Sequence, residues 1–518
     1  MARLFNTSGP CDPRFHYMLP VLRRLPEVRG LIDQRAYFVL HAPRQMGKTT
    51  SLLALAGELT AEGRYAAILL SAEVGAPFAG DTNAAEAAIL DASRGRASNR
   101  LPIELLPPPW PEAPPGRRIG AALSAWARAC PRPLVVFFDE IDALADGTLV
   151  SVLRQLRDGF ADRPEAFPSS LALVGLRDVQ DYKVAAGGSG RLGSSSPFNI
   201  KAESITLRNF NREEVAELYE QHTSDTGQVF LPEAVDRAFY WTQGQPWLVN
   251  ALARQLVEKL VPDSTRSITA KDVDVAKEIL IARRDTHLDS LAERLREERV
   301  RRIVEPILAG LSMPDVAEDD IRFVLDLGLL KMSETGGLEA ANPIYREVIP
   351  RVLAFTPQAS LPMIAPSWLS SAGDGRLDPT RLLDAFLVFW RQHGEPLMKS
   401  APYHEIAPHL VLMAFLHRVV NGGGTIDREY AIGSGRMDLC VRHRDMTLAI
   451  EIKVWRDGEP DPVEEGLSQL DGYLAGLSRD SGWLVIFDRR SGQPRIAQRT
   501  STEQRSTPSG REVTLIRA

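Results

Sequence analysis

Acidic and basic side chains stand at strand spacing in two short apolar runs near the end of the chain. Asp438 lies in the run 437–441, and Glu451 and Lys453 lie in the run 448–455. In the second run the apolar residues occupy every second position, which is the period of a β-strand. A short polar segment separates the two runs, so we expect a β-hairpin that brings Asp438 and Glu451 within reach of each other.

The chemistry of this hairpin follows from the charges that it gathers. Two neighbouring carboxylates repel each other unless a divalent cation lies between them, and Mg²⁺ prefers oxygen ligands. Lys453 could then orient or activate a water molecule, or stabilise the charge that develops on a phosphate. The alternative interpretation is an amphipathic hairpin at a sheet edge whose polar face is simply exposed to water.

Further polar residues stand in the segments on both sides of the hairpin. Glu405 lies in an apolar-periodic helix before the hairpin. Gln469 and Tyr473 lie four residues apart on one face of the following helix, and residues 483–490 have the pattern of another buried strand. This order of residues, over about 380–518, resembles the PD-(D/E)XK nuclease superfamily.

The resemblance implies a role for each of these side chains. Asp438 and Glu451 would bind Mg²⁺, Lys453 would assist the attacking water, and Glu405 would support the metal. Met437 stands where the family name has proline, a departure that changes none of the charged groups. The complete implied catalytic set is Glu405, Asp438, Glu451, Lys453, Gln469 and Tyr473, of which the last two would line the site.

A phosphate-binding loop is predicted in the first part of the chain. Residues 36–59 combine a buried-strand run, a break and an amphipathic helix, and the break ends in Gly47, Lys48 and Thr49. Backbone amides at a helix N-terminus bind phosphates, Lys48 would reach the β- and γ-phosphate oxygens, and Thr49 would bind Mg²⁺. Ala42 replaces the usual first glycine, which we expect to weaken the turn. The predicted nucleotide-binding residues are Ala42, Pro43, Arg44, Gln45, Met46, Gly47, Lys48, Thr49, Thr50 and Asp139.

A second strand supplies the acids that such a loop requires. Residues 131–142 form an apolar run that ends in Asp139 and Glu140. Asp139 would act with Thr49 in holding Mg²⁺, and Glu140 would polarise the water that attacks the γ-phosphate. Because the acidic strand end and the phosphate-binding loop occur together, we interpret both as parts of a nucleotide site and not as chance matches.

The segment that follows predicts a helical lid. Asn211, with Glu214 three residues later, is typical of a capping box at a helix start. Gly244 interrupts the next helical pattern, and Pro246 suits a first helical turn. The order of phosphate-binding loop, acidic strand end, third strand and lid, over about residues 15–265, resembles AAA+-like ATPases of the STAND and origin-recognition type.

This second resemblance implies further properties. ATP would be the ligand, and many members of the family form rings. A third buried strand, 169–179, ends in Arg177 and Asp178, and in such ATPases this strand end senses the γ-phosphate. A salt bridge within a loop is the alternative for these two charges. The segment around Tyr17 either holds the adenine or packs as an N-terminal arm.

The middle of the chain predicts a winged-helix module. Residues 290–355 show two helices and then a short hairpin pattern before a last helix. The candidate recognition helix is acidic, and an acidic surface repels phosphates. We therefore favour a structural or protein-docking role over DNA recognition. The acidic residues of that helix are Glu318, Asp319, Asp320 and Asp326.

The amino-acid composition indicates a globular protein of several domains. The 518 residues are 44% hydrophobic and 25% charged with a net charge of −6, which suits several globular domains and gives no overall signal for nucleic-acid binding. Cys11, Cys130 and Cys440 are scattered and show no disulfide or metal-binding spacing, which suits a reducing cytoplasm. Because no apolar run reaches the roughly 18 residues of a membrane span, we expect a cytoplasmic protein without membrane contact.

A local positive charge does occur at the end of the chain. From Arg489 onward seven arginines stand against Glu503 and Glu512. Such a segment can bind phosphates, and a solvated tail is the alternative.

Together these patterns predict an α/β fold in several parts. We expect an ATP-binding and ATP-hydrolysing switch coupled to a Mg²⁺-dependent nuclease that acts on DNA, in a role such as defence against foreign DNA. The alternatives are an ATPase-regulated interaction protein whose nuclease-like domain binds DNA or RNA, or a protein partner, without cleaving. Self-association is a further expectation. The predicted parts are a P-loop ATPase core with a parallel sheet (1–205), a helical lid (206–285), a winged-helix-like module (286–355), a linker (356–379) and a restriction-endonuclease-like α/β domain (380–518).

Overall fold

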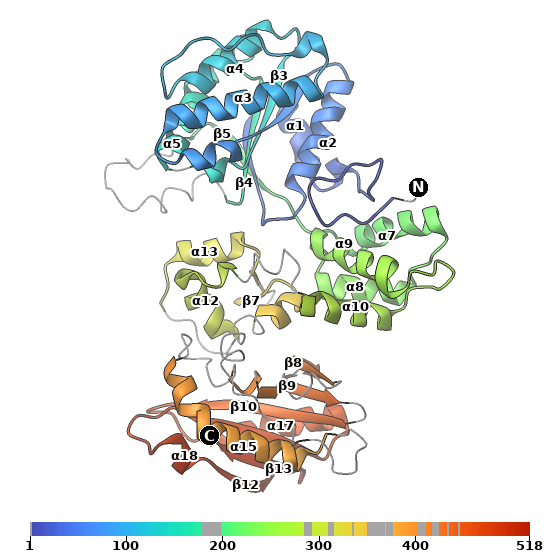
Figure 1. Cartoon of the computed structure of the whole chain (residues 1–518), viewed down its shortest axis with the longest axis vertical. Coiled ribbons are helices and arrows are strands. Elements are labelled where there is room, and N and C mark those ends of the chain that lie inside the picture. Colours follow the sequence, from blue (N-terminus) through green and yellow to red (C-terminus); the bar gives the residue numbers. More distant parts are fainter. Residues whose placement is uncertain are drawn as a thin grey trace. The chain divides into compact units, whose positions relative to one another are not determined.

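The computed structural model of the chain describes two compact units (Figure 1). By their internal contacts these units are Met1–Asp289 with Ala317–Ile344, and Ser290–Val316 with Tyr345–Ala518. The predicted domain boundaries stay predictions. The described residues are 3–144, 146–177, 198–283, 293–308, 315–333, 336–349, 368, 377–400, 411–413, 415–416, 424–432, 435–443 and 446–518.

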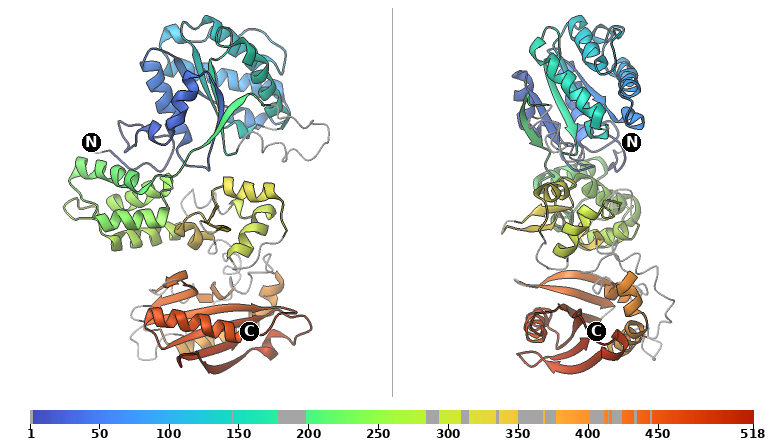
Figure 2. Two further views of the ribbon diagram at one scale, coloured as in Figure 1. Left: turned by 180° about the vertical axis from the view of Figure 1, so that it is seen from behind. Right: turned by 90° about the vertical axis from the view of Figure 1, so that its left-hand side faces the viewer.

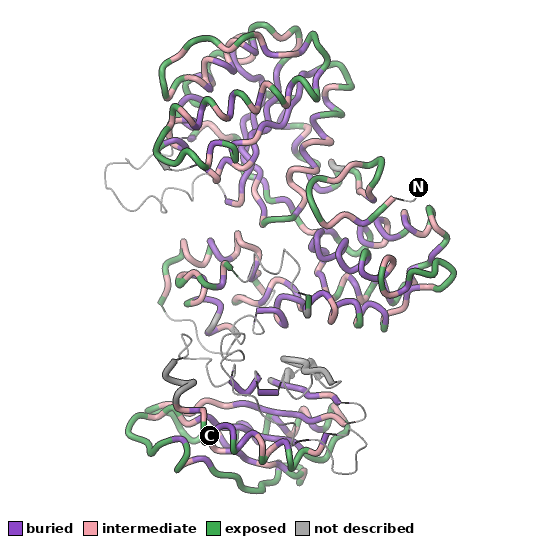
Figure 3. Tube along the Cα trace, in the orientation of Figure 1, coloured by how far each residue is buried: buried purple, intermediate pink, exposed green. Residues whose placement is uncertain are grey.

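A five-stranded parallel sheet lies at the centre of the first unit and confirms the predicted fold class. Because β4 lies between β1 and β3, the strand before the phosphate-binding loop and the strand that ends in Asp139 are separated by one strand. The strands are buried over nearly their whole length except at the edge strand β5 (Figure 3). In spatial order they are β2 (Ala66–Ser71), β3 (Leu134–Asp139), β4 (Ser170–Gly175), β1 (Tyr37–His41) and β5 (Lys201–Thr206).

Alternate residues of these strands face two separate cores. Phe38 and Leu40 belong to one core, and Tyr37 and Val39 belong to the other. Helices therefore cover both sides of the sheet (Figure 2), as a parallel sheet with continuous apolar strands requires. The first core packs against α1 (Pro26–Asp33) and α2 (Lys48–Ala61), and the second against α3 (Thr82–Arg100), α4 (Arg118–Ala129) and α5 (Asp146–Asp158). Short helices are η1 (Val21–Arg23), η2 (Glu73–Phe78), η3 (Ile103–Leu105), η4 (Ile141–Ala143) and η5 (Gly159–Asp162).

The predicted lid is a group of helices after β5. The capping box is present, because the Asn211 side chain accepts from the Glu214 N–H while the Glu214 carboxylate accepts from the Asn211 N–H. Gly244 has a φ of +70°, and a Cβ there would lie 1.8 Å from the Phe210 carbonyl oxygen, so only glycine fits. The lid helices are α7 (Arg212–Thr226), α8 (Pro232–Thr242), α9 (Pro246–Gln255), the π-helical η6 (Leu256–Leu260) and α10 (Ala270–Arg283).

The expected wing is present in the middle of the chain. Strands β6 (Leu330–Met332) and β7 (Leu338–Ala340) pair as an antiparallel hairpin after the acidic helix α13 (Glu318–Asp326). By its contacts α13 belongs to the first unit, whereas α12 (Glu298–Leu308) belongs to the second.

A six-stranded mixed sheet forms the centre of the second unit. Strands β10, β11 and β13 are parallel, β9 is antiparallel to β10, β8 is antiparallel to β9, and β12 is antiparallel to β13. In spatial order the strands are β12 (Ser501–Ser506), β13 (Glu512–Arg517), β11 (Ser481–Asp488), β10 (Met446–Trp455), β9 (Gly435–His443) and β8 (Gly424–Ile432). The helices are α15 (Pro379–Ser400), α17 (Val463–Leu477) and α18 (Ile496–Arg499).

The predicted hairpin is β9 followed by β10. Its ladder pairs Leu439 with Ile450 and Cys440 with Ala449. Ala449 lies in the core beneath α17, and side chains of a strand alternate between its two faces. Glu451 and Lys453, two and four residues after Ala449, are therefore on the α17 face, which explains why charged groups interrupt an otherwise apolar strand. None of the described helices is long and apolar enough to cross a membrane.

Candidate functional site

The phosphate-binding loop connects β1 to α2 as the sequence predicts. Gly47 caps α2 with a φ of 87°, in the left-handed region that glycine adopts without strain. The other left-handed residue of the loop is Gln45, with a φ of 60°. Ala42 is 1% exposed and is not left-handed. The expectation that Ala42 weakens the turn was therefore wrong, because the turn needs no glycine at that position.

Lys48, Thr49 and Asp139 meet at the carboxyl edge of the parallel sheet. The Lys48 ammonium donates to the carbonyl oxygens of Ala42 (2.6 Å) and Pro43 (3.0 Å). Thr49 Oγ1 donates to Asp139 Oδ2 at 2.7 Å. Burial lowers the pKa of Lys48, and the charge of Asp139 opposes that shift. The structure thus brings together the amine, the hydroxyl and the first acid that the two motifs predicted.

Glu140 adopts a constrained backbone beside Asp139. Its φ is 57°, and its N–H donates to Asp139 Oδ1 at 3.0 Å. The Ser71 hydroxyl, at the end of the neighbouring strand β2, donates to Glu140 Oε2 at 3.0 Å. Burial raises the pKa of the Glu140 carboxyl, and burial likewise raises the pKa of Asp139. A carboxylate with a raised pKa, fixed by a hydrogen bond, is suited to polarise a water molecule.

The N-terminal arm packs on the first unit rather than presenting Tyr17 to solvent. Tyr17 is 2% exposed, its ring lies 4.7 Å from that of Phe5, and a hydrogen bond of 3.2 Å joins its hydroxyl to His222 Nδ1. Further along the arm, the Cys11 N–H donates to Thr50 Oγ1 at 3.1 Å. Of the two interpretations of this segment, the packed arm is the one that the structure supports.

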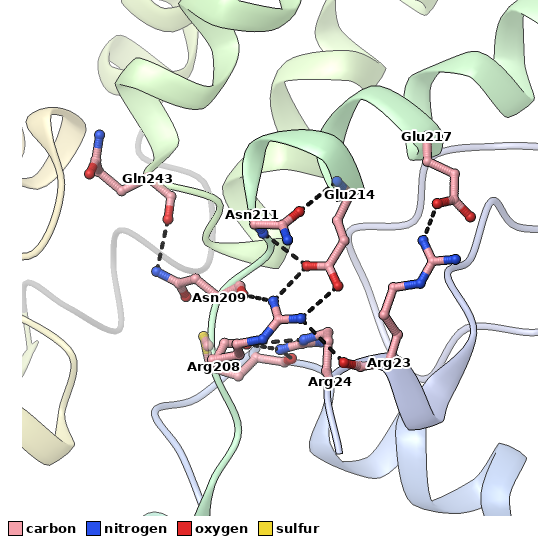
Figure 4. A network of polar contacts seen from close by, with 9 residues as sticks. Arg23, Arg24, Arg208, Asn209, Asn211, Glu214, Glu217 and Gln243 are labelled. Atoms are coloured by element: carbon pink, nitrogen blue, oxygen red, sulfur yellow. Dashed lines mark hydrogen bonds and ion pairs between the residues drawn. The ribbon is translucent and has the colours of Figure 1, made fainter. Parts of the chain in front are cut away.

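A buried arginine that no motif predicted connects the phosphate-binding loop to the lid. Arg24 donates to the Met46 carbonyl (3.0 Å) and, through Nε, to the Arg208 carbonyl (3.0 Å). Arg208 in turn holds Glu214 through two hydrogen bonds of 2.6 and 2.8 Å, and Glu214 also closes the capping box with Asn211 (Figure 4). Burial lowers the pKa of Arg24 to about 10. Its position in the sequence, within an ordinary polar turn, carried no signal of this contact.

The end of the third strand contacts the acidic helix of the middle module. Arg177 Nε donates to Asp326 Oδ2 at 3.0 Å, and the guanidinium lies 4.9 Å from the centre of the Phe323 ring. A Cβ at Gly328, just after α13, would lie 2.7 Å from Pro43 Cγ, so the backbone there packs against the phosphate-binding loop. Arg177 thus forms a salt bridge, but with a distant helix and not within a loop as the alternative above had it, and γ-phosphate sensing stays a prediction. The other predicted residue, Asp178, lies outside the described residues.

In the second unit, Lys453 is the centre of the candidate nuclease site. Its ammonium lies 3.3 Å from Glu451 Oε1, 3.0 Å from Glu465 Oε1 and 2.6 Å from Gln469 Oε1. Gln469 Nε2 also donates to Glu465 Oε1 at 3.2 Å. Glu451 is 3% exposed. Glu465, one helical turn before Gln469 on α17, is a residue that the sequence analysis missed; its spacing of four from Gln469 was the available signal.

The structure describes only some of the remaining predicted nuclease residues. Tyr473 lies one turn after Gln469 and is partly buried against the core beneath α17. Asp438 lies on β9, one step beyond the last paired residues of the hairpin, and its side chain lies outside what the structure describes. Glu405 also lies outside the described residues. Within the described part of the chain, no group of three or more His, Cys, Asp or Glu side chains is placed to hold a metal ion.

The donor sets can still be compared with the needs of Mg²⁺. Thr49 and Asp139 present a hydroxyl and a carboxylate oxygen in contact with each other, and these are ligands that Mg²⁺ takes in phosphate-binding sites. Glu451 and Glu465 present carboxylates to the same ammonium group. Both sets consist of oxygen donors and fit a hard divalent cation.

Comparisons with known proteins bear on the fold. No protein-family model matches the chain, and no curated protein matches it. Solved structures with a similar fold include a Walker-type ATPase of Pyrococcus abyssi (13% identity, 67% of this chain and 99% of that chain, TM-score 0.47). Others are RuvB, a Holliday junction branch migration motor of Thermotoga maritima (15%, 63% and 92%, 0.35), and Cdc6p of Pyrobaculum aerophilum (16%, 67% and 96%, 0.35).

The chain is an α/β protein whose first unit carries a phosphate-binding loop at the carboxyl edge of a parallel sheet. Because all three TM-scores lie below 0.5, this assignment rests on the strand order and on the geometry of the phosphate-binding loop. The order places the loop after β1 and the acids after β3, with β4 between them.

Proposed function

We propose that the first unit binds and hydrolyses ATP with Mg²⁺ and that it acts as a switch for a nuclease in the second unit. The observation that carries the ATPase proposal is the convergence of Lys48, Thr49, Asp139 and Glu140 at one edge of the parallel sheet, with the 2.7 Å contact between Thr49 and Asp139. A DNA substrate and a role in defence against foreign DNA belong to the proposal as the finer expectation.

Each side chain of the ATPase site has one task in this proposal. Lys48, whose ammonium now donates to loop carbonyls, neutralises the β- and γ-phosphate oxygens. Mg²⁺ held by Thr49 and Asp139 supplies further charge neutralisation when it is bound. Glu140, fixed by Ser71, accepts a hydrogen bond from the attacking water and aligns it with the γ-phosphate.

The contact between Arg177 and Asp326 supports the switch. Arg177 follows β4, next to the strand that leads into the phosphate-binding loop, and its charge is compensated by Asp326 of α13. A γ-phosphate would compete with Asp326 for this guanidinium, because arginine binds phosphate and carboxylate oxygens in the same geometry. ATP would thereby weaken the attachment of α13, whereas ADP, which lacks the γ-phosphate, would leave it in place.

The group around Lys453 supports the nuclease proposal. The Lys453 ammonium lies 3.3 Å from the buried carboxylate of Glu451 and 3.0 Å from the carboxylate of Glu465, at the α17 face of the sheet. Lys453 would orient a water or stabilise negative charge on a cleaved phosphate, and Glu451 would share a Mg²⁺ ion with Asp438. The carboxylates also hold the Lys453 side chain in position.

The ATPase proposal is tested with two variants that fail in different ways. Lys48→Ala should abolish nucleotide binding, because the contact with the β- and γ-phosphates is lost. Glu140→Gln should bind ATP normally and release no phosphate, because only the polarisation of water is lost. Binding is measured by titration with a fluorescent ATP analogue, and turnover by phosphate release. A Glu140→Gln variant that hydrolyses ATP at the wild-type rate would show that Glu140 is not the catalytic base.

The nuclease proposal is tested by incubating the full chain with plasmid and with single-stranded DNA, with and without Mg²⁺ and ATP. Cleavage that requires Mg²⁺ and changes with ATP supports the coupled activity. Binding of DNA without cleavage under every nucleotide condition would favour the interaction protein instead. A chain that neither binds nor cleaves DNA would favour the alternative in which the second unit binds a protein partner.

A further inference from the structure

The seven arginines near the end of the chain fall into two groups. Four of them are neutralised by carboxylates of the same unit. For Arg489, Arg495 and Arg499, the described residues supply no ion-pair partner. The neutralised group consists of Arg490 with Asp488 (2.8 Å), Arg505 with Glu503 (3.2 Å), Arg511 with Asp471 (2.6 Å) and Arg517 with Asp461 (2.7 Å).

Two arginines of the second group gather with Arg456 at one edge of the mixed sheet. Strands β10 and β11 are parallel, and their last paired residues are Trp455 and Asp488. The chain therefore leaves both strands with an arginine, Arg456 after β10 and Arg489 after β11, and the Arg489 N–H donates to the Trp455 carbonyl at 2.8 Å. The short helix α18 ends in Arg499.

Helix α15 contacts the chain beside Arg499 and beside Arg489: Arg391 donates to the Thr500 carbonyl at 3.2 Å, and the Trp390 ring lies 5.0 Å from that of Phe487. Desolvation lowers the pKa of Arg489, and repulsion from Arg456 and Arg499 lowers it further. Arg499 Nε is buried without a hydrogen-bond partner among the described residues. We call Arg456, Arg489 and Arg499 the arginine edge.

The nearby carboxylates are already used by other groups. Both oxygens of Asp488 accept hydrogen bonds from Arg490, at 3.0 and 2.8 Å. Asp457 accepts from the Ser491 backbone N–H. Asp488 also attracts Arg499 through space, and Asp457 keeps its negative charge, because a backbone N–H is neutral. No ion pair of 4.0 Å or less joins the arginine edge to a carboxylate among the described residues, so its three cations exceed the negative charge of Asp457 alone, although the whole chain is acidic.

We propose that the arginine edge binds the phosphate backbone of a DNA strand. Three guanidinium groups held close together against their mutual repulsion are stabilised by a polyanion, and the planar arginine fork matches phosphate oxygens. Arg489 is exposed and the other two are half-buried, so the edge combines an accessible group with two that are held in position. Such contacts orient a nucleic acid without reading its sequence.

The place of the edge in the sheet connects it to the candidate nuclease site. Arg456 directly follows β10 and stands three residues after Lys453, which corresponds to about 10 Å at the strand rise of roughly 3.3 Å per residue. Side chains three positions apart on a strand face opposite sides, so a DNA strand bound at the edge would have to pass the end of β10 to reach Lys453. This part of the inference rests on the proposed nuclease function, whereas the binding of phosphates by the edge does not.

The test compares two double variants of the full chain that remove the same charge. Arg489→Ala with Arg499→Ala removes two members of the edge, and Arg505→Ala with Arg517→Ala removes two arginines that carboxylates already neutralise. Binding of a fluorescent DNA duplex, and of its single strand, is measured by anisotropy over a range of salt concentrations with EDTA present, so that cleavage cannot occur. Thermal unfolding of each variant checks that the fold is retained.

We expect the salt dependence of DNA affinity to change only in the edge variant, Arg489→Ala with Arg499→Ala. Each lost phosphate contact lowers the slope of log affinity against log salt by about 0.9 for duplex DNA, so the edge variant should lose about 1.8 units. The control variant should keep the wild-type slope. Arg489→Lys with Arg499→Lys should keep most of the slope, because the charge remains.

Three results would overturn the proposal. They are a wild-type chain that does not bind DNA at low salt, an edge variant with an unchanged slope, and equal losses in both double variants, which would indicate a general charge effect. A wild-type chain that binds DNA through the edge but cleaves none with Mg²⁺ would refute the nuclease function and leave this proposal standing.

Discussion

Substitution of Asp326 by asparagine tests the switch directly. The change removes the charge that compensates Arg177 and keeps the size of the side chain. The two side chains are 8% and 18% exposed, so the pair is largely buried. Breaking a fully buried pair costs about 3–5 kcal/mol. Asparagine can still accept one hydrogen bond and Arg177 keeps its contact with Phe323, so we expect a smaller loss of about 2 kcal/mol.

This loss sets the size of the expected effect on nucleotide binding. If the γ-phosphate and Asp326 compete for Arg177, the free energy released by Asp326→Asn appears as tighter ATP binding, by up to about 30-fold for 2 kcal/mol. ADP lacks the γ-phosphate, so its affinity should not change. The assay is competitive titration of ATP and ADP against a fluorescent analogue, in the Glu140→Gln background so that ATP persists.

The control for this experiment lies on the same helix. Glu318→Gln makes the same change of charge but breaks only the exposed pair with Arg322, whose side chains are 76% and 55% exposed, and such pairs contribute little. It should leave both affinities unchanged. The reasoning would be refuted if Asp326→Asn changed ATP and ADP binding equally, or if it still changed ATP binding in a chain that also carries Arg177→Ala.

The remaining predictions concern the two catalytic groups. Because burial raises the pKa of Glu140, the rate of ATP hydrolysis should fall with decreasing pH at values where an exposed glutamate is still ionised; a profile with an ordinary glutamate pKa would contradict this role. Glu451→Ala should abolish both DNA cleavage and Mg²⁺ binding, whereas Lys453→Ala should abolish cleavage alone, as calorimetric Mg²⁺ titration beside a plasmid assay would show. Glu465→Gln should reduce cleavage about tenfold, the effect of roughly one charge-assisted hydrogen bond, without weakening Mg²⁺ binding, and the exposed neighbour Glu464→Gln should change neither.

Local patterns were sufficient to predict much of the fold. The strands of the parallel sheet appear as short apolar runs because helices cover both faces, and the capping box at Asn211 depends on residues only three apart. The hairpin of β9 and β10 was also predictable, since a change of one position would move Glu451 and Lys453 to the opposite face. In each case the residues whose types predict the element lie close to one another in the sequence.

The contacts that complete the sites could not be predicted in this way. Arg24 reaches Met46 over 22 positions, and Arg177 reaches Asp326 over 149. Arg24 stands in a turn and Arg177 follows a buried strand, and neither local pattern shows whether the charge is exposed or buried against a distant carbonyl or carboxylate. Glu465 shows the same limit on a smaller scale, because its exposed position at the start of α17 is typical of a solvated helix end.

Counting charges along the terminal segment had a similar limit. Seven arginines predicted either a phosphate-binding surface or a solvated tail, and the structure shows that neither description applies to all of them. Arg490 and Arg517 are matched with Asp488 and Asp461, which no spacing rule required. Charge density along the sequence is therefore a weaker guide to a phosphate site than the number of cations that remain without a carboxylate.

The cations of this chain fall into two kinds, those that donate to acceptors of the protein and those without a carboxylate partner among the described residues. Lys48, Arg177 and Lys453 each donate to acceptors of the protein itself, namely loop carbonyls, Asp326, and the group of Glu465 with Gln469. A phosphate that binds any of them must replace those acceptors, so its affinity is a difference between two interactions, and removing an acceptor should strengthen phosphate binding. Within the described part of the second unit no carboxylate forms an ion pair with the arginine edge, so phosphate binding there displaces no such partner. Regulation by exchange of partners is thus available to the first kind, and constant attraction for a polyanion to the second.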